Sequence, residues 1–280
     1  MYCDFNGDFL LEEKAAVPIH NRAFRYGDAV FESMRCINGK IPFLVPHCQR
    51  LFAALNTLQF EIPLYFDRIF LESRINNLLS INKLQKKDAK IRLSVYRDGA
   101  GNYTPTTNAL GFLITCEPLA ETGFAFNPKG LFLGAYTDFV HPNTPFSAFK
   151  NGNSLYYVLA GIYAQKNQFG ECVLLNENQH IVECISSSFF MVINKEIFTP
   201  PLHDGAVAGV MRSAIMEICK KNNLTITEKS LKIADMEQAD EVFLTNATLG
   251  VRWAMGFEKH RFYKTETSKI QKMLNEAAMQ

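Results

Sequence analysis

The sequence predicts an α+β protein with two domains, and three observations support this class. Strand-like segments around Asn-Gly pairs dominate the first half, whereas strands are mixed with helices in the second half. Between the halves, residues 118–130 contain two prolines and two glycines and show little hydrophobic periodicity, which is typical of a linker. We therefore expect a small domain over residues 1–118, a linker over 119–129 and a larger domain over 130–280.

Two hairpins are expected near the N-terminus, because Asn-Gly suits the two positive φ angles of a type I′ turn. The strands that flank Asn6-Gly7 and Asn38-Gly39 are, in order, Tyr2–Phe5, Phe9–Leu11, Phe31–Ile37 and Ile41–Leu44. Pro46 then opens a helix whose apolar residues recur at helical spacing. A second helix is expected over Asp67–Leu79, followed by strands over Lys90–Tyr96 and Leu110–Cys116.

The second half carries strands and helices in mixed order. The expected strands are Leu131–Tyr136, Cys172–Asn176, His180–Glu183, Phe189–Ile193 and Glu241–Thr245. The expected helices are Ser154–Lys166, Val210–Lys221 and Ser268–Ala278. A loop over His141–Lys150 precedes the first of these helices, and the small-residue segment Gly205–Gly209 introduces the second.

Composition excludes several classes of protein. The chain has 280 residues, 48% of them hydrophobic and 20% charged, and a net charge of +1, so neither nucleic acid nor an anionic membrane surface is an expected partner. No apolar run is long enough to cross a bilayer, and the N-terminus does not read as a signal peptide. The seven cysteines are scattered without a C-x-x-C pair, so we expect no metal site and a reducing, cytoplasmic location.

Four features could carry chemistry. Lys150 follows an apolar pair, and a lysine desolvated by apolar surface loses its proton more readily and can attack a carbonyl. Glu183 ends a strand beside three serines, where a carboxylate could hold a protonated ring nitrogen. The helix start at Gly209 and the planar guanidinium of Arg50 both suit a phosphate. Each alone is better explained as an ordinary surface or turn residue, but together they match the needs of one cofactor, pyridoxal 5'-phosphate.

The order and spacing of these features resemble the class IV aminotransferases, the fold-type IV pyridoxal-phosphate enzymes. The resemblance begins in the segment Asn21–Glu32 and continues in His47-x-x-Arg50-Leu51. It covers nearly the whole chain through Lys150, Glu183, Thr199–Leu202, Gly209–Arg212 and Ala239–Val242. It implies a small α+β domain, a larger pseudo-barrel domain and a homodimer.

The resemblance also implies roles for individual residues. Lys150 would form the Schiff base and move the substrate proton, and Glu183 would pair with the pyridine nitrogen. Arg50 and the backbone of Val210 and Met211 would hold the phosphate, with Ser187 against the cofactor. Ala247 stands where many relatives place a phosphate-binding threonine, so that contact is in doubt.

The residues expected to contact the substrate do not all match one group of the family. Phe31 before Glu32 and Gly101 to Tyr103 after Arg97 lack the features of D-amino-acid enzymes. Tyr26 and Arg92 resemble the substrate positions of branched-chain aminotransferases, and we include Arg97 with them, although Leu155 replaces a tyrosine that those enzymes carry. We favour transfer of an amino group between an L-amino acid, of branched-chain type, and a 2-oxo acid.

Two other functions remain open. Val210-Met211-Arg212 and Asn246-Ala247 match the aminodeoxychorismate lyases, which make 4-aminobenzoate and pyruvate. A non-catalytic cofactor or metabolite binder is a third hypothesis, and the intact set of Lys150, Glu183 and Arg50 argues against it.

Overall fold

The computed structural model describes residues 1–279, which divide by their internal contacts into two units. The first unit comprises Met1–Gly123 together with Phe149–Asn153, and the second comprises Phe124–Ala148 and the chain from Ser154 onward. The chain leaves the first unit inside the segment expected to be the linker, although the short segment around Lys150 groups with the first unit. The division into domains over residues 1–118 and 130–280 remains a prediction.

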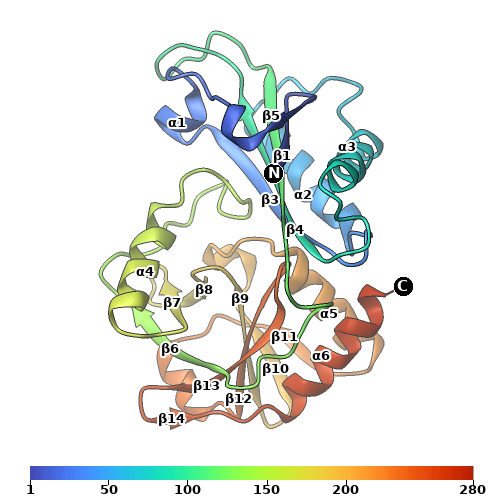
Figure 1. The fold of residues 1–280 in the computed structure, drawn as a ribbon. Coiled ribbons are helices and arrows are strands. Elements are labelled where there is room, and N and C mark those ends of the chain that lie inside the picture. The colour runs from blue at the N-terminus through green and yellow to red at the C-terminus, as the bar shows by residue number, and fades with distance from the viewer. Residues whose placement is uncertain (280) are drawn as a thin grey trace. The chain divides into compact units, whose positions relative to one another are not determined.

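The first unit is an antiparallel sheet covered on one face by helices. Its strands lie in the order β2-β1-β5-β4-β3. Their bounds are β1 (Tyr2–Phe5), β2 (Asp8–Leu11), β3 (Ala29–Cys36), β4 (Ala89–Arg97) and β5 (Leu110–Pro118). The helices are α1 (Arg22–Tyr26), α2 (Leu44–Thr57) and α3 (Arg68–Ile81). Helix α2 packs on β3, and α3 packs on β1 and β5 (Figure 1).

The apolar residues of this unit form one core between the two long helices and the sheet. Ile91, Leu93 and Val95 are buried at alternate positions of β4, as the period-two pattern predicts. Leu51 and Leu55 of α2 meet them from the helix side. The core face of the sheet is therefore fixed, and the intervening side chains of β3 and β4 take the other face.

The structure confirms the first of the two expected hairpins. For the second, the turn is confirmed, but the predicted strand after it does not form. Asn6 and Gly7 have φ angles of 53° and 97°, and β1 pairs with β2 across them. Asn38 and Gly39 also turn the chain, but the pairing stops at Ile37 and Lys40. Residues 41–44 form no strand because Pro42 has no N–H to donate and α2 begins at Leu44.

The second unit is built on a mixed sheet in the order β11-β10-β9-β12-β13-β6-β7-β8, with β14 beside β13. Its strands are β6 (Leu131–Tyr136), β7 (Glu171–Leu175), β8 (Ile181–Cys184), β9 (Ser188–Ile193), β10 (Glu196–Thr199), β11 (Ile226–Glu228), β12 (Glu241–Asn246), β13 (Gly250–Phe257) and β14 (His260–Arg261). A bridge between Ile181 and Leu231, just beyond β11, links the two ends of the sheet. This curled sheet confirms the predicted pseudo-barrel.

Helices complete the second unit. They are α4 (Leu155–Lys166), α5 (Val210–Lys221) and α6 (Thr265–Ala278). Helix α4 packs on β6 and β7, whereas α5 and α6 pack on each other and on β12. The predicted site residues of the second unit lie at the ends of β8 and β12 and at the start of α5.

Candidate active site

Lys150 lies in a segment that extends the free edge of the first unit's sheet. The N–H of Phe31 donates to the Lys150 carbonyl at 2.9 Å, and the N–H of Gly152 donates to the Ala29 carbonyl at 2.8 Å. Phe149 packs against the core of this unit. Because side chains alternate along an extended backbone, Lys150 takes the opposite face, where its Nζ lies 5.5 Å from the centroid of the Phe31 ring. The backbone from the Lys150 carbonyl to Gly152 is therefore held against β3.

Two glycines allow this pairing. A Cβ on Gly152 would lie 2.6 Å from the carbonyl oxygen of Gly27, which is closer than van der Waals contact permits. Gly27 itself ends α1 with a φ of 66°, a left-handed conformation that glycine adopts without strain. Tyr26, the last residue of α1, is thereby brought to the same corner of the unit as the Lys150 segment.

Arg92 belongs to the same face of the sheet. Its guanidinium carbon lies 3.9 Å from the centroid of the Phe31 ring, so Phe31 contacts the cationic ends of both Arg92 and Lys150. The first unit thus places Lys150 and Arg92 around Phe31, and it places Tyr26 next to Gly27, which packs against Gly152 of the Lys150 segment. They come from separate parts of the chain, and only the strand pairing brings them together.

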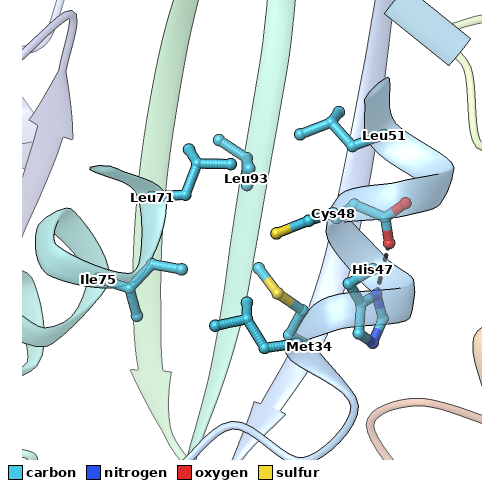
Figure 2. Close-up of a pocket in the computed structure, with 9 residues that line it drawn as sticks. Met34, His47, Cys48, Leu51, Leu71, Ile75 and Leu93 are labelled. Atoms are coloured by element: carbon cyan, nitrogen blue, oxygen red, sulfur yellow. Dashed lines mark hydrogen bonds and ion pairs between the residues drawn. The ribbon is translucent and has the colours of Figure 1, made fainter. Parts of the chain in front are cut away.

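Arg50 lies on the helix-covered face instead. Its Nε and Nη2 donate to the two carboxylate oxygens of Glu32 at 2.8 and 2.5 Å. His47 Nδ1 lies 2.6 Å from Glu32 Oε2, the contact that is dashed in Figure 2. Burial alone would raise the pKa of Glu32, but the charge of Arg50 and the hydrogen bonds from His47 and Arg50 outweigh it, so that this pKa is lowered. The orientation of the Arg50 guanidinium is therefore set by a buried carboxylate.

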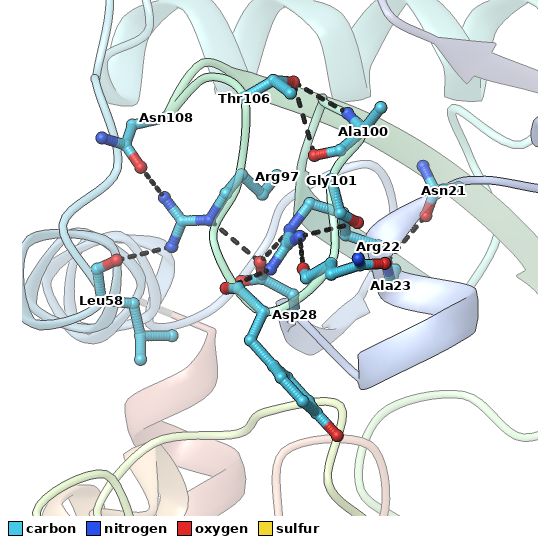
Figure 3. Close-up of polar contacts among 12 residues, drawn as sticks. Asn21, Arg22, Ala23, Asp28, Leu58, Arg97, Ala100, Gly101, Thr106 and Asn108 are labelled. Carbon is cyan, nitrogen blue, oxygen red and sulfur yellow. Dashed lines mark hydrogen bonds and ion pairs between the residues drawn. The ribbon is translucent and has the colours of Figure 1, made fainter.

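Arg97 is buried and its guanidinium is engaged within the first unit. Nε donates to Asp28 at 2.9 Å, Nη1 to the Asn108 side chain at 2.7 Å and Nη2 to the Leu58 carbonyl at 2.7 Å (Figure 3). Asp28 also accepts from Arg22 at 2.7 Å. This network fixes both ends of the loop that carries residues 98–108, so the geometry gives Arg97 a structural task.

Glu183 lies in the second unit at the end of β8, and it is buried. The hydroxyl of Tyr157, on α4, donates to its Oε1 at 2.6 Å. Nε2 of His141 lies 2.9 Å from that hydroxyl oxygen. No role for Tyr157 or His141 was predicted from the sequence. His141 lies 16 residues before Tyr157 and Glu183 lies 26 residues after it, and no local pattern indicates that residues so far apart will meet.

The start of α5 lies beside the turn between β8 and β9. Gly209 caps this helix without a side-chain hydrogen bond among the described residues, and a Cβ there would lie 2.6 Å from Ser188 Oγ. The N–H groups of Val210 and Met211 belong to the first turn, where a helix offers its own residues no acceptor. Their dipoles add to a positive potential at this end.

Ser187 and the turn that holds Ala247 are linked next to this helix start. Ser188 pairs with Thr245 in the sheet, and the side-chain amide of Asn246 donates to Ser187 Oγ at 3.2 Å. Thr245 Oγ1 is buried and makes no hydrogen bond to any described residue. The second unit therefore brings together Ser187, Ala247 and the Val210–Met211 backbone, and it holds Glu183 on β8, the strand that leads into the turn with Ser187.

Residues 1–279 contain neither a cluster of metal-ligating side chains nor a membrane-spanning helix. No group of three or more His, Cys, Asp or Glu side chains there is placed to hold a metal ion. In the same residues no helix has the length and apolar character needed to cross a membrane.

Comparison with known proteins gives consistent matches over this fold. The sequence profile of amino-transferase class IV matches residues 29–254. An aminodeoxychorismate lyase of Vibrio harveyi is 27% identical over 237 residues, which cover 84% of this chain and 85% of that protein. A branched-chain-amino-acid aminotransferase of Escherichia coli is 28% identical over 251 residues, covering 87% and 81%.

The fold is also shared with solved structures. The crystal structure of a Brucella abortus aminotransferase bound to PLP matches with a TM-score of 0.88 and 21% identity, covering 100% of this chain and 99% of that one. The profile match spans most of the chain and includes β3, Lys150, Glu183 and the start of α5. The chain is therefore a member of the amino-transferase class IV family.

Proposed function

We propose that this protein is a pyridoxal-phosphate-dependent aminotransferase that moves an amino group between an L-amino acid and a 2-oxo acid, with branched-chain amino acids as the preferred class. The observation that carries the proposal is the setting of Lys150. The backbone from its carbonyl to Gly152 is bonded to β3, and its amine lies over an aromatic ring beside Arg92. A lysine fixed in this way suits covalent chemistry at its Nζ better than a lysine on a mobile loop.

The donor set of the second unit fits this cofactor. The buried carboxylate of Glu183 suits a protonated ring nitrogen, because a carboxylate opposite that nitrogen favours its charged form. The backbone N–H groups at Val210 and Met211 suit a phosphate. We assign Ser187 to the phosphate end of the cofactor, where Ala247 can offer only its backbone. We assign Arg50 as the guanidinium that adds positive charge for the phosphate.

The residues have distinct tasks in the proposed reaction. When bound, the cofactor supplies an electrophilic carbon for amines and a ring that accepts electron density. Lys150 Nζ removes the α-proton of the amino acid and later returns a proton. Tyr26 and Arg92 orient the substrate carboxylate, while Arg97 shapes the adjoining loop through Asp28 and Asn108.

A second candidate is 4-amino-4-deoxychorismate lyase activity. It is favoured by the match to the Vibrio harveyi lyase and by Leu155, which supplies no hydroxyl. The two reactions differ in their demands, since a transaminase needs a 2-oxo acid acceptor and the lyase needs none.

One assay separates the candidates. The purified holoenzyme is incubated with isoleucine or glutamate plus a 2-oxo acid, and separately with aminodeoxychorismate without an acceptor. We expect a new amino acid to form in the first reaction and no 4-aminobenzoate in the second. Release of 4-aminobenzoate and pyruvate, with no amino transfer, would establish the lyase instead.

We also propose that the protein acts as a homodimer, with α4 contributing to the interface. The most apolar helix of the chain exposes Leu155, Val158, Leu159 and Ile162, which recur at the spacing of one helix face. A continuous exposed apolar row is typical of an interaction surface.

The dimer is tested by the mass of the protein in solution. Ile162→Glu should shift light-scattering mass from dimer toward monomer, because a charge would have to be buried in an apolar contact. Ile69→Glu, on the exposed side of α3, serves as the matched control and should leave the mass unchanged. A wild-type protein that is monomeric at micromolar concentration would refute the proposal.

A further inference from the structure

We propose that Tyr157 and His141 are positioning residues that hold the Glu183 carboxylate ionised and oriented toward a protonated heteroaromatic nitrogen. This inference rests on the proposed function of Glu183 and adds the groups that keep it fit for that task. All three residues belong to the second unit and come from three different parts of it.

The three polar groups form a chain that bends by roughly a right angle at the phenol oxygen. Tyr157 Oη lies 2.6 Å from Glu183 Oε1 and 2.9 Å from His141 Nε2, whereas His141 Nε2 lies 4.0 Å from Glu183 Oε1. His141 therefore acts on the carboxylate through the phenol. The backbone of His141 is itself anchored, because its N–H donates to the Leu175 carbonyl at 2.7 Å.

The direction of donation follows from the number of protons. An ionised carboxylate can only accept, and Tyr157 has a single hydroxyl proton, which it must give to Glu183. The phenol oxygen then accepts from Nε2–H of His141. Two donors in series thus point toward one carboxylate, and hydrogen bonds donated to a carboxylate favour its ionised form.

The charges of the two helpers fit this scheme. Burial, aided by the charge of Glu183, raises the pKa of Tyr157 well above its ordinary value, so the phenol keeps its proton. Burial also lowers the pKa of His141, so the imidazole is neutral at pH 7. A cationic imidazole would offset the charge of Glu183, whereas a neutral one leaves that charge for the ring nitrogen.

Packing alone gives no reason for a histidine at this position. His141 is 6% exposed, and among the described residues its Nδ1 makes no hydrogen bond of standard geometry, although the Pro142 carbonyl interacts with the imidazole. A buried polar atom without a partner destabilises the folded protein. The need for Nε2 as the hydrogen-bond donor to Tyr157 explains why His141 is present in spite of this cost.

The test reads the protonation of the ring nitrogen directly. The holoenzyme is reconstituted with cofactor that carries 15N in its ring, and the 15N chemical shift is measured at pH 7.5. The carboxylate that loses a donor binds a proton more tightly. We therefore expect Tyr157→Phe to lower the ratio of protonated to unprotonated ring nitrogen about tenfold, as for loss of one charge-assisted hydrogen bond. His141→Leu weakens the phenol as a donor without removing it, so it should lower the same ratio by a smaller factor.

Matched variants separate positioning from structure. His141→Gln keeps an N–H donor at similar reach and should restore the wild-type shift that His141→Leu loses. Tyr163→Phe makes the same substitution two turns along α4, where the hydroxyl is not bonded to Glu183, and should change nothing. If Tyr157→Phe does not fold, the two His141 variants carry the test.

The outcomes distinguish the inference from the proposed function. If Glu183→Gln leaves the 15N shift at its wild-type value, Glu183 is not the partner of the ring nitrogen and the proposed function of that residue fails. If Glu183→Gln removes the protonated signal but Tyr157→Phe and His141→Leu retain it, the assignment of Glu183 stands and this inference is overturned.

Discussion

Lys150→Ala is expected to abolish turnover, with a loss of at least roughly 10⁴-fold in kcat, because it removes both the nucleophile and the base that moves the α-proton. The measurement is a steady-state assay of amino transfer together with the visible spectrum of the reconstituted protein. The covalent link to the lysine shifts that spectrum, so the variant should show the absorption of unlinked cofactor.

The fold should survive this substitution. The Lys150 segment is held by its backbone N–H and carbonyl groups, which alanine retains. Lys166→Ala, at the exposed end of α4, controls for the loss of a positive charge and should keep wild-type turnover. Turnover of Lys150→Ala within tenfold of wild type would show that another residue performs the chemistry.

Glu183→Gln is expected to lower kcat by roughly 10²- to 10³-fold, which corresponds to about 3–4 kcal/mol of transition-state stabilisation. The amide keeps the shape of the side chain but removes the charge that favours a protonated ring nitrogen, and the ring then accepts electrons less readily. The measurement is single-turnover kinetics of the first half-reaction, which isolates chemistry from product release.

Two companion variants sharpen this result. Glu177→Gln makes the same change at an exposed turn before β8 and should have no effect on the rate. Glu183→Asp keeps the charge but shortens the side chain, and it should fall between Glu183→Gln and wild type. An unchanged rate in Glu183→Gln would remove the carboxylate from the mechanism.

The fold could be predicted where local patterns decide it. Asn6-Gly7 set the first hairpin because both residues adopt positive φ, and the alternation in β4 matched its buried face. The segment Ile41–Leu44 looked equally strand-like, but Pro42 and the early start of α2 prevented pairing. Local apolar content alone cannot tell a strand from the approach to a helix.

The candidate site was predictable only in part, for a related reason. Lys150 and Glu183 stood out by residue type and order along the chain. Tyr157 and His141 did not, because their contact with Glu183 depends on how α4 packs on the sheet. Arg97 remains a predicted substrate residue, and its sequence context did not indicate that Asp28 and Asn108 would engage its guanidinium.

The central claim is that the amine of Lys150 carries the cofactor. Borohydride reduction of the wild-type holoenzyme, followed by proteolysis and mass spectrometry, identifies the lysine directly. The account predicts that the reduced cofactor adduct lies on the peptide that contains Lys150 and is missing in Lys150→Ala. An adduct on Lys129 or Lys166 in its place would contradict the account.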